Sequence, residues 1–521
     1  MHLLRFIGPS LMLATLSVSA AELRVPGQFA SIQAAIDAAK AGDTVRVAPG
    51  EYRERLKLKP GITVRSAGNA AKGKLGLARA EATILNHPKG QGPGVLMAEG
   101  AVLDGFTITG VGRYDEAKWK KNHATQGNDQ EHEHIGGPGT AGIEVRHTCV
   151  VENNIVHHIG YTGIGITGMP GRKVSPRIIA NICYRNMGGG IGSMRGSTAL
   201  IEGNLCFENF YAGIGHNGAS PKVIGNTCHS NIRAGIGISE GSSPLVKGNR
   251  CYKNRRAGIG IRTGKDTRPV VEDNDCFEND MAGIGAEEHA RPVIRGNRCI
   301  KNKLAGIGCR LHAEPEIIQN ICRENRAAGI GVDGAQAVIR DNQLINNALV
   351  AVGLRKGSKA TLTGNTFQRE GGMPPLVAVL EQSQAVLEKN VLRGGGVAGV
   401  LLQGTATISG NEFHGNGPRR GGPPNFAVWV RAGSKVEFVG NSVTRWRHAL
   451  HAAGAQAVKA NDNRMSQFLG TGLVIQNSRT PAEATGNMAF AADPKAQAVA
   501  ITGLRGTVKD NQVQPPKEEV K

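Results

Sequence analysis

An acid, a cation and several ring-bearing side chains fall within one short stretch of the chain. Glu144 and Arg146 alternate along the segment A-G-I-E-V-R-H, and His147 follows them. If this segment is a strand, both alternating side chains point to the same face. His158 and Tyr161 occupy the corresponding turn one repeat later. These five candidate catalytic residues can remove a proton beside a carboxylate-bearing sugar carbon, with Arg146 binding the carboxylate and His147 or His158 as base or acid.

A long polar insertion, residues 111–138, precedes this segment. It contains D-Q-E-H-E-H, in which His132 and His134 flank Glu133. Imidazole and carboxylate ligands suit zinc or copper, so His132 and His134 are candidate metal ligands, with His147 nearby. An H-x-H pair is a weak signal, and the same residues suit a solvated loop that covers its neighbours. No cofactor other than such a divalent metal is expected.

A column of charged residues recurs once per repeat later in the chain, and its sign alternates. The column reads Arg262, Glu287, Arg310, Asp333, Arg355, Glu381, Gln403 and Arg431. Alternation favours a ladder of ion pairs that fixes the stacking of the repeats. Arginine and carboxylate groups in a row also suit the binding of an acidic sugar, so Arg262, Arg310 and Arg431 are candidate substrate-binding residues.

Trp429 is a fourth candidate substrate-binding residue. It follows a second insertion, residues 414–426, that carries Arg419 and Arg420, and it stands where other repeats have glycine. An indole ring can stack on a sugar face, or it can pack beneath its own insertion.

One repeating unit carries all these residues. The segment L-V-K-G-N-R-C-Y-K-N-R-R-A-G-I-G-I-R, residues 245–262, recurs with variations, and its asparagines are about 24 residues apart. This period is typical of a three-strand solenoid turn, and stacked asparagines can hydrogen-bond to one another along the rod. The asparagine anchors are Asn154, Asn181, Asn204, Asn226, Asn249, Asn274, Asn297, Asn320, Asn342, Asn365, Asn390, Asn411, Asn441, Asn461, Asn487 and Asn511.

The last strand of each unit, A-G-I-G, predicts isoleucine inside and two glycine columns outside. The first column runs from Gly142 through Gly163 to Gly329, and the second from Glu144 through Gly165 to Gly331. A strip without side chains suggests close approach by a glycan, a covering loop or a second molecule, or it reflects duplication of one tolerated motif. Seven cysteines fall one per repeat, which indicates free thiols in the core. They are Cys183, Cys206, Cys228, Cys251, Cys276, Cys299 and Cys322.

Residues 26–53 predict a short helix capped by Ser31 and ended by Gly42, which would cover the first open rung. The order of this helix, G-D-T-V-R-V-A-P-G-E-Y-R-E and L-K-L-K-P-G-I-T-V-R-S-A-G resembles the opening of pectate-lyase-like right-handed parallel β-helix proteins. The later repeats resemble the carbohydrate-binding and sugar-hydrolase repeats of that superfamily, including the periplasmic nitrous-oxide-reductase maturation family. The resemblance implies an all-β fold: a single right-handed parallel β-helix of about 17–18 rungs.

The chain departs from the enzymes of that superfamily in its motifs. It lacks the aspartate set that binds calcium in pectate lyases and the D-P-H-type motif of mannuronate epimerases. It also lacks the paired catalytic aspartates of polygalacturonases and pectin methylesterases. The resemblance therefore implies architecture and leaves activity open.

The net charge and the apolar segments of the chain indicate its partners and its location. Lys and Arg number 62 against 42 Asp and Glu, giving +20, which favours an anionic partner: acidic polysaccharide, lipopolysaccharide, nucleic acid or a membrane surface. The same charge also suits a soluble basic surface without a specific partner. The partner that we expect is an acidic polysaccharide, and we expect no nucleic acid. Residues 1–20 read as a signal peptide, and no later run is apolar enough to insert into a membrane, so we expect a periplasmic or extracellular protein. The expected divisions are 1–20, a cap with first rungs at 21–66, the β-helix at 67–513 and a disordered tail at 514–521.

Three functions fit these features. The first is binding or modification of an acidic polysaccharide, of lyase or epimerase type. The second is a non-catalytic periplasmic binding or metal-linked maturation protein. The third is a structural surface rod whose glycine strip is an interface.

Overall fold

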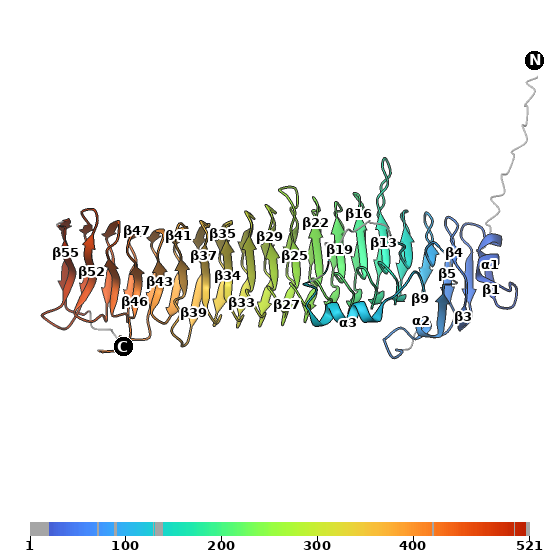
Figure 1. The fold of residues 1–521 in the computed structure, drawn as a ribbon, viewed down its shortest axis with the longest axis horizontal. Helices are drawn as coiled ribbons and strands as arrows, with labels where there is room; N and C mark the ends of the chain where they lie inside the picture. Colours follow the sequence, from blue (N-terminus) through green and yellow to red (C-terminus); the bar gives the residue numbers. More distant parts are fainter. Residues whose placement is uncertain are drawn as a thin grey trace, which may run out of the picture.

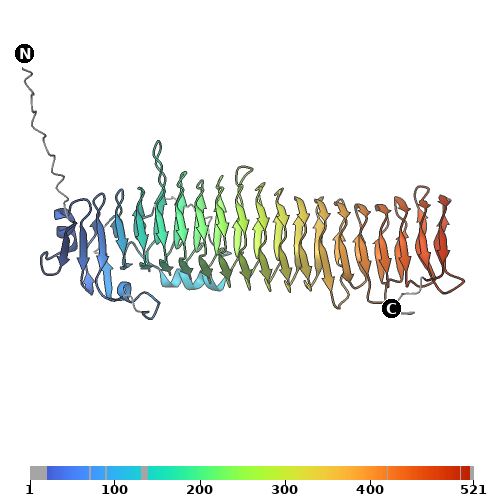
Figure 2. The same ribbon diagram turned by 180° about the vertical axis from the view of Figure 1, so that it is seen from behind.

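The computed structural model describes residues 20–69, 72–87, 91–128, 130, 139–418, 421–504 and 506–516. Residues 1–19 of the expected signal peptide lie outside these segments, as does the end of the tail from residue 517. The described chain is a straight rod of stacked rungs with the capping helix at one end (Figures 1 and 2).

Three parallel sheets run the length of the rod. Each rung beyond the first adds one strand to each sheet, so strands in the body of the rod pair with the third strand before them and the third strand after them. Sheet A has 20 strands, from β1 (Glu22–Val25) and β2 (Thr44–Val47) to β56 (Thr507–Lys509). Sheet B has 19, from β3 (Gly50–Tyr52) to β57 (Gln512–Gln514). At about 4.8 Å per rung the rod is on the order of 90 Å long.

Sheet C has 18 strands and carries most of the candidate residues. Its strands are β4 (Leu56–Lys57), β7 (Val95–Leu96), β10 (Ile143–Val145), β13 (Ile164–Thr167), β16 (Ile191–Met194), β19 (Ile214–Asn217), β22 (Ile236–Ser239), β25 (Ile259–Ile261), β28 (Ile284–Ala286), β31 (Ile307–Arg310), β34 (Ala328–Asp333), β37 (Val350–Arg355), β40 (Val377–Val379), β43 (Ala398–Leu402), β46 (Phe426–Val430), β49 (His448–Ala453), β52 (Thr471–Ser478) and β55 (Gln497–Gly503).

The predicted β-helix is confirmed, and the rod is longer than expected. The asparagine ladder that set the estimate begins at Asn154, whereas the sheet A strands β1, β2, β5 (Thr63–Ser66) and β8 (Val102–Asp104) precede it. The expected helix is α1 (Ile32–Ala38). Ser31 Oγ accepts a hydrogen bond from Ala34 N at 3.1 Å, and α1 buries Ile32, Ala35 and Ile36 over the first rung.

The asparagines after sheet A form a continuous buried ladder. In each step one asparagine donates through its backbone N and its Nδ2 to Oδ1 of the next, at 2.8–2.9 Å for Asn204, Asn226 and Asn249. One expected anchor was wrong: Asn463, not Asn461, accepts from Asn441 and donates to Asn487. Asn461 lies at the end of β50 (Ala457–Asn461) and bonds to Glu483 instead.

A second ladder, which the sequence interpretation missed, lies at the corner between sheets B and C. Its members bond in the same way, Nδ2 to Oδ1 of the next, and are buried. They are Asn186, Asn209, Asn231, Asn254, Asn279, Asn302, Asn325 and Asn347. Residues just before these asparagines have a left-handed backbone, such as Glu208 with φ 52° and Lys253 with φ 52°. The ladder bonds offset the cost of these turns.

The core between the sheets is aliphatic with a cysteine column in sheet B. All nine cysteines are free and buried, and seven of them form the column that was expected to hold free thiols. Burial raises the pKa of Cys309 to about 12, so this thiol stays protonated and unreactive. No helix in the described segments is long and apolar enough to cross a membrane.

We predict that Asn297→Ala destabilises the rod by about 3 kcal/mol or more. The substitution removes donors to Val271 O, Arg295 O and Asn320 Oδ1, and it removes the Oδ1 acceptor of Asn274 N in a dry site. Urea or thermal unfolding measures the loss.

The control is Asn461→Ala, which removes a half-buried asparagine outside the ladder and should cost about 1 kcal/mol. If the two variants lose the same free energy of unfolding, a ladder asparagine contributes no more to stability than an asparagine outside the ladder.

Candidate functional site

The two glycine columns of sheet C lie on different sides of the sheet. The first column was expected to face outward, and this was wrong. A Cβ added to Gly283 would lie 2.8 Å from Asn302 Nδ2, 2.8 Å from Gly306 O and 3.0 Å from Cys299 Cβ. Glycine is needed here because the second asparagine ladder and the cysteine column occupy the space.

The second glycine column faces outward. It is partly exposed from Gly237 onward, whereas Gly165, Gly192 and Gly215 are buried. Its glycines are Gly165, Gly192, Gly215, Gly237, Gly260, Gly285, Gly308, Gly331 and Gly353. A Cβ added at Gly285 or Gly308 would meet nothing closer than 4.0 Å and 3.7 Å. Internal packing therefore does not require glycine at these positions, and a strand loses stability by having it.

This column is the floor of a groove of about 510 Å³ that spans the rungs from Ala257 to Ala378. One wall is apolar, with Met281, Leu304 at 47% exposure and Leu349 at 56%. The opposite wall is the charged column. A contiguous exposed apolar surface beside a bare backbone is typical of a binding surface.

The charged wall is paired along the rod, as alternation predicted. Arg310 Nε hydrogen-bonds to Glu287, and Arg355 Nη2 lies 2.7 Å from Asp333 Oδ2. Burial raises the pKa of Asp333, but hydrogen bonds from Lys356 and Arg355 outweigh it and lower the pKa overall. The substrate-binding role of Arg262 and Arg310 stays a prediction.

Glu144 ends the glycine column at the N-terminal side. It occupies the place of Gly165 one rung earlier, and its Oε1 lies 2.5 Å from Nη2 of Arg146 on the same strand. His147 follows at the corner toward sheet A, with Nδ1 3.5 Å from Glu99 Oε2. The expected alternation of Glu144 and Arg146 is what the strand shows.

His158 and Tyr161 lie at the opposite end of these strands. Both precede β13, whereas Arg146 and His147 follow β10, and the two strands are parallel neighbours. The ring of Tyr161 lies against Gly139, where an added Cβ would come 2.4 Å from Tyr161 Cγ. The five candidate residues thus form two groups, on the order of 15 Å apart along the strand direction.

The insertion after Val111 contains a helix that the sequence interpretation missed. Helix α3 (Glu116–Ala124) runs parallel to the rod along the corners between sheets B and C (Figure 1). Trp119 anchors it: the side chain is buried against Phe210 and Ile232, and Nε1 donates to Glu208 O at 2.8 Å.

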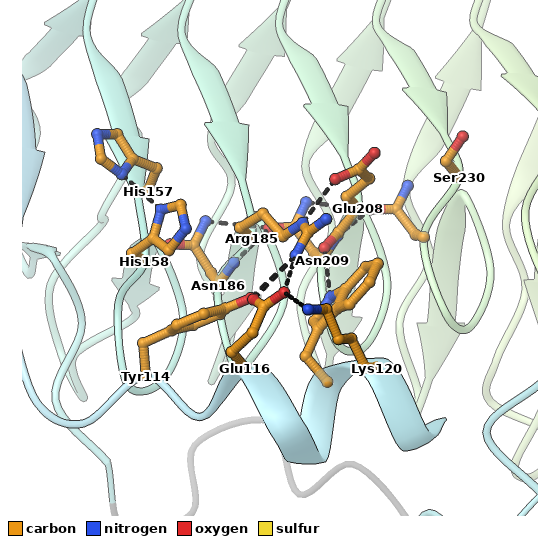
Figure 3. A network of polar contacts seen from close by, with 12 residues as sticks. Tyr114, Glu116, Lys120, His157, His158, Arg185, Asn186, Glu208, Asn209 and Ser230 are labelled. Atoms are coloured by element: carbon orange, nitrogen blue, oxygen red, sulfur yellow. Dashed lines mark hydrogen bonds and ion pairs between the residues drawn. The ribbon is translucent and has the colours of Figure 1, made fainter. Parts of the chain in front are cut away.

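A polar network joins α3 to the rungs (Figure 3). Arg185 binds Glu208 at 2.6 Å and Glu116 at 3.0 Å, and its guanidinium stacks 3.8 Å above the Trp119 ring. The Tyr114 hydroxyl donates to Glu116 at 2.7 Å, which together with Arg185 lowers the pKa of Glu116 to about 2. Every member has a partner, so this network is best explained as a clamp on α3.

Two histidines adjoin the clamp. His157 Nδ1 and His158 Nδ1 are 2.7 Å apart, so one nitrogen carries the shared proton. Burial, reinforced by His158, lowers the pKa of His157 to about 4, and burial also lowers the pKa of His158. His157 begins a stack of rings on sheet B that continues through Tyr184 at 4.9 Å and Phe207.

The metal prediction cannot be placed on the structure. His132 and His134 lie outside the described residues, as do Arg419 and Arg420. Within the segments that are described, no group of three or more His, Cys, Asp or Glu side chains could hold a metal ion.

Trp429 lies half-exposed on the outer face of sheet C. The Arg431 guanidinium is 4.7 Å from its ring centre, and the buried Phe426 meets its edge at 5.7 Å. Trp429 continues the outward glycine column, as expected.

Comparison with known proteins identifies the family. Residues 123–259, 212–367 and 374–513 match the family model described as right handed beta helix region. These matches cover more than half of the chain, which therefore belongs to the right-handed β-helix family. No curated protein matches the chain.

Several solved structures are similar at low identity. A mutant of the periplasmic alginate epimerase AlgG is 14% identical over 61% of this chain and 81% of its own, with a TM-score of 0.45. Pectate lyase Pel9A is 14% identical over 67% and 76%, with a TM-score of 0.31. The catalytic unit of an α-1,3-glucanase from Streptomyces thermodiastaticus is 13% identical over 66% and 61%, with a TM-score of 0.37. Similarities of this size assign no activity to this chain.

We predict that acid loosens the rod through His157. Its pKa is about 4 in the folded chain and 6.5 for an ordinary imidazole, so the unfolded chain binds the extra proton between these values. This contribution to stability is complete above pH 6.5 and is lost as the pH falls toward about 4. His157→Phe keeps the ring stack and should flatten the fall in unfolding free energy over this window.

The matched control is His414→Phe, at an exposed histidine beside Glu412. The fall in its unfolding free energy toward pH 4 should persist, because His157 is unchanged. If the unfolding free energy of His157→Phe falls with pH as steeply as that of the unmodified protein, His157 is not the source of the acid sensitivity.

Proposed function

We propose that this protein binds an extended polysaccharide chain along the groove of sheet C. The observation that carries the proposal is the outward glycine column: five successive rungs, from Gly260 to Gly353, give the groove a floor of bare backbone, and internal packing does not require glycine at Gly285 and Gly308. A glycan approaching the sheet closely would be excluded by any side chain in this column. The rungs repeat at about 4.8 Å, similar to the length of one pyranose unit, so successive sugars meet equivalent surroundings.

The proposal includes a preference for acidic chains. The net charge of +20 attracts polyanions over a Debye length, although the groove wall itself is largely paired. It also includes export, for which the support is residues 1–20. The apolar wall from Met281 to Leu349 would contact the less polar faces of the sugar rings.

We predict that Gly308→Leu weakens binding of polygalacturonate or alginate about tenfold or more. The new side chain fits the fold, because the nearest atom to the added Cβ is 3.7 Å away, and it fills the groove. Calorimetric titration measures affinity, and the thermal midpoint confirms folding.

Thr361→Leu is the control, since it adds a similar side chain to the exposed face of sheet A. It should bind as the unmodified protein does. Unchanged affinity for Gly308→Leu would reject the groove as the binding site.

A second candidate function is elimination or epimerisation of a uronate at the N-terminal end of the strip. The observation that favours it is the carboxylate of Glu144, which ends the glycine column and is paired with Arg146. Arg146 would neutralise the substrate carboxylate while His147 takes the adjacent C–H proton. The freed electron pair then expels the neighbouring glycosidic oxygen, or the carbon is reprotonated on its other face.

We predict that Arg146→Ala and His147→Ala abolish any unsaturated product or inverted sugar formed from alginate or polygalacturonate, with binding in the groove retained. Absorbance at the conjugated double bond and proton NMR detect the two products. Product formation that is unaffected in both variants would exclude these residues from catalysis.

A further inference from the structure

At the C-terminal end of the groove, larger side chains replace the glycines of its floor. The outward column passes from Gly353 to Ala378, then to Leu401, Trp429 and His451 in paired register. The neighbouring column changes in parallel, from Ala398 to Phe426 and His448. A floor that is bare over the five rungs from Gly260 to Gly353 therefore gives way to four rings on two neighbouring strands. A chain lying in the groove meets a wall here.

The four rings form a fixed block. The Phe426 ring stacks on His451 at 4.5 Å and on His448 at 5.4 Å. His448 Nδ1 lies 2.7 Å from Thr471 O, so this nitrogen carries the proton, and burial lowers the pKa of the ring and keeps it neutral. Arg447 Nη2 ties the end of the preceding insertion to the block through Gly422 O at 2.7 Å.

Trp429 is partly exposed, as are His448 and His451, and it is the ring of the block nearest the groove. Phe426 is 6% exposed and forms the support, whereas Trp429 is half-exposed on the groove side of His451. An indole buried beneath its own insertion would have lost this exposure. A supported, half-exposed indole offers a rigid surface on which a sugar ring can pack.

Arg431 breaks the charge pairing of its column. Arg310 and Arg355 each pair with the carboxylate of a neighbouring rung. The corresponding residues on the neighbouring strands are Gln403 and Ala453, and no ion pair forms at Arg431 among the residues described. Its guanidinium instead lies over the Trp429 ring at 4.7 Å. The block thus places an uncompensated cation beside an exposed aromatic surface, which complements a sugar that carries a carboxylate.

We propose that Trp429 and Arg431 form the terminal subsite of the groove and that it recognises a uronate. The pyranose ring packs on the exposed part of the indole, and its carboxylate pairs with the Arg431 guanidinium. The inference rests on the proposed function and adds to it the class of sugar and the place where the chain ends. In this view the net charge attracts acidic chains at long range and the groove supplies contact area, while Arg431 distinguishes an acidic from a neutral sugar in the bound chain.

The test uses oligogalacturonates and their methyl esters, in which each carboxylate is replaced by a neutral ester that is one methyl group larger. The unmodified protein should bind the acid form at least about tenfold more tightly. Arg431→Gln should remove this preference and leave binding of the ester unchanged. Trp429→Ala should weaken both ligands about tenfold, and Trp429→Leu, which repeats the residue at Leu401, serves if the alanine variant does not fold.

The controls carry the same changes away from the subsite. Arg340→Gln removes an exposed arginine of sheet A, and Val474→Ala truncates the same outward column beyond the block. Both should behave as the unmodified protein.

The outcomes separate the two proposals. If Gly308→Leu loses binding while Arg431→Gln keeps the acid preference, the groove stands and the uronate subsite is rejected. If Trp429→Ala binds both ligands as the unmodified protein does, the stacking role is rejected in the same way. If the protein binds neither ligand, or Gly308→Leu binds both normally, the proposed function fails together with this inference.

Discussion

The hydrogen bonds between stacked asparagines are the constraint on which the rest of the molecule depends. Each rung closes on three short strands, and its corners use left-handed backbone at residues other than glycine. Such corners are unfavourable singly and persist because buried amides bond from rung to rung. Since these bonds form only when rungs align, the ladders hold all three sheets in one register and space the rungs evenly.

This constraint explains the first glycine of the A-G-I-G motif. It does not explain the second glycine, which we attribute to function. The first glycine is dictated by the ladder, because any Cβ at Gly283 would meet Asn302 and Cys299. The second glycine, at Gly285 or Gly308, meets no close atom inside the molecule. One motif therefore has two physical causes: packing for the inward column and access for the outward one. The groove, its paired wall and its two ends follow from that outward column.

Much of the fold could be predicted from the sequence. The period of the asparagines indicated the solenoid, Ser31 and its apolar stripe indicated α1, and the cysteine spacing indicated a column of buried thiols. The rung count fell short because the first rungs lack ladder asparagines. The second ladder had a readable signal, which the sequence interpretation missed: an asparagine stands five residues after each of the eight anchors from Asn181 to Asn342, such as Asn254 after Asn249.

The site was harder to predict because its geometry depends on how the chain turns between strands, which the spacing of residues in the sequence does not give. Strand direction separates His158 from Arg146, although both lie near Glu144 in the sequence. Helix α3 is almost wholly polar and is held by one tryptophan and by Arg185, a residue distant in sequence that only the fold brings near. The ring block at Trp429 required the register of neighbouring strands, which local pattern does not supply.

The central claim is that the outward glycine column is a binding surface for an acidic glycan. A crystal structure of the complex with an oligogalacturonate tests it most directly. The account predicts a sugar chain lying parallel to the rod above Gly285, Gly308 and Gly331, with its end at Trp429. Sugar bound on sheet A or sheet B, with the groove of sheet C empty, would contradict it.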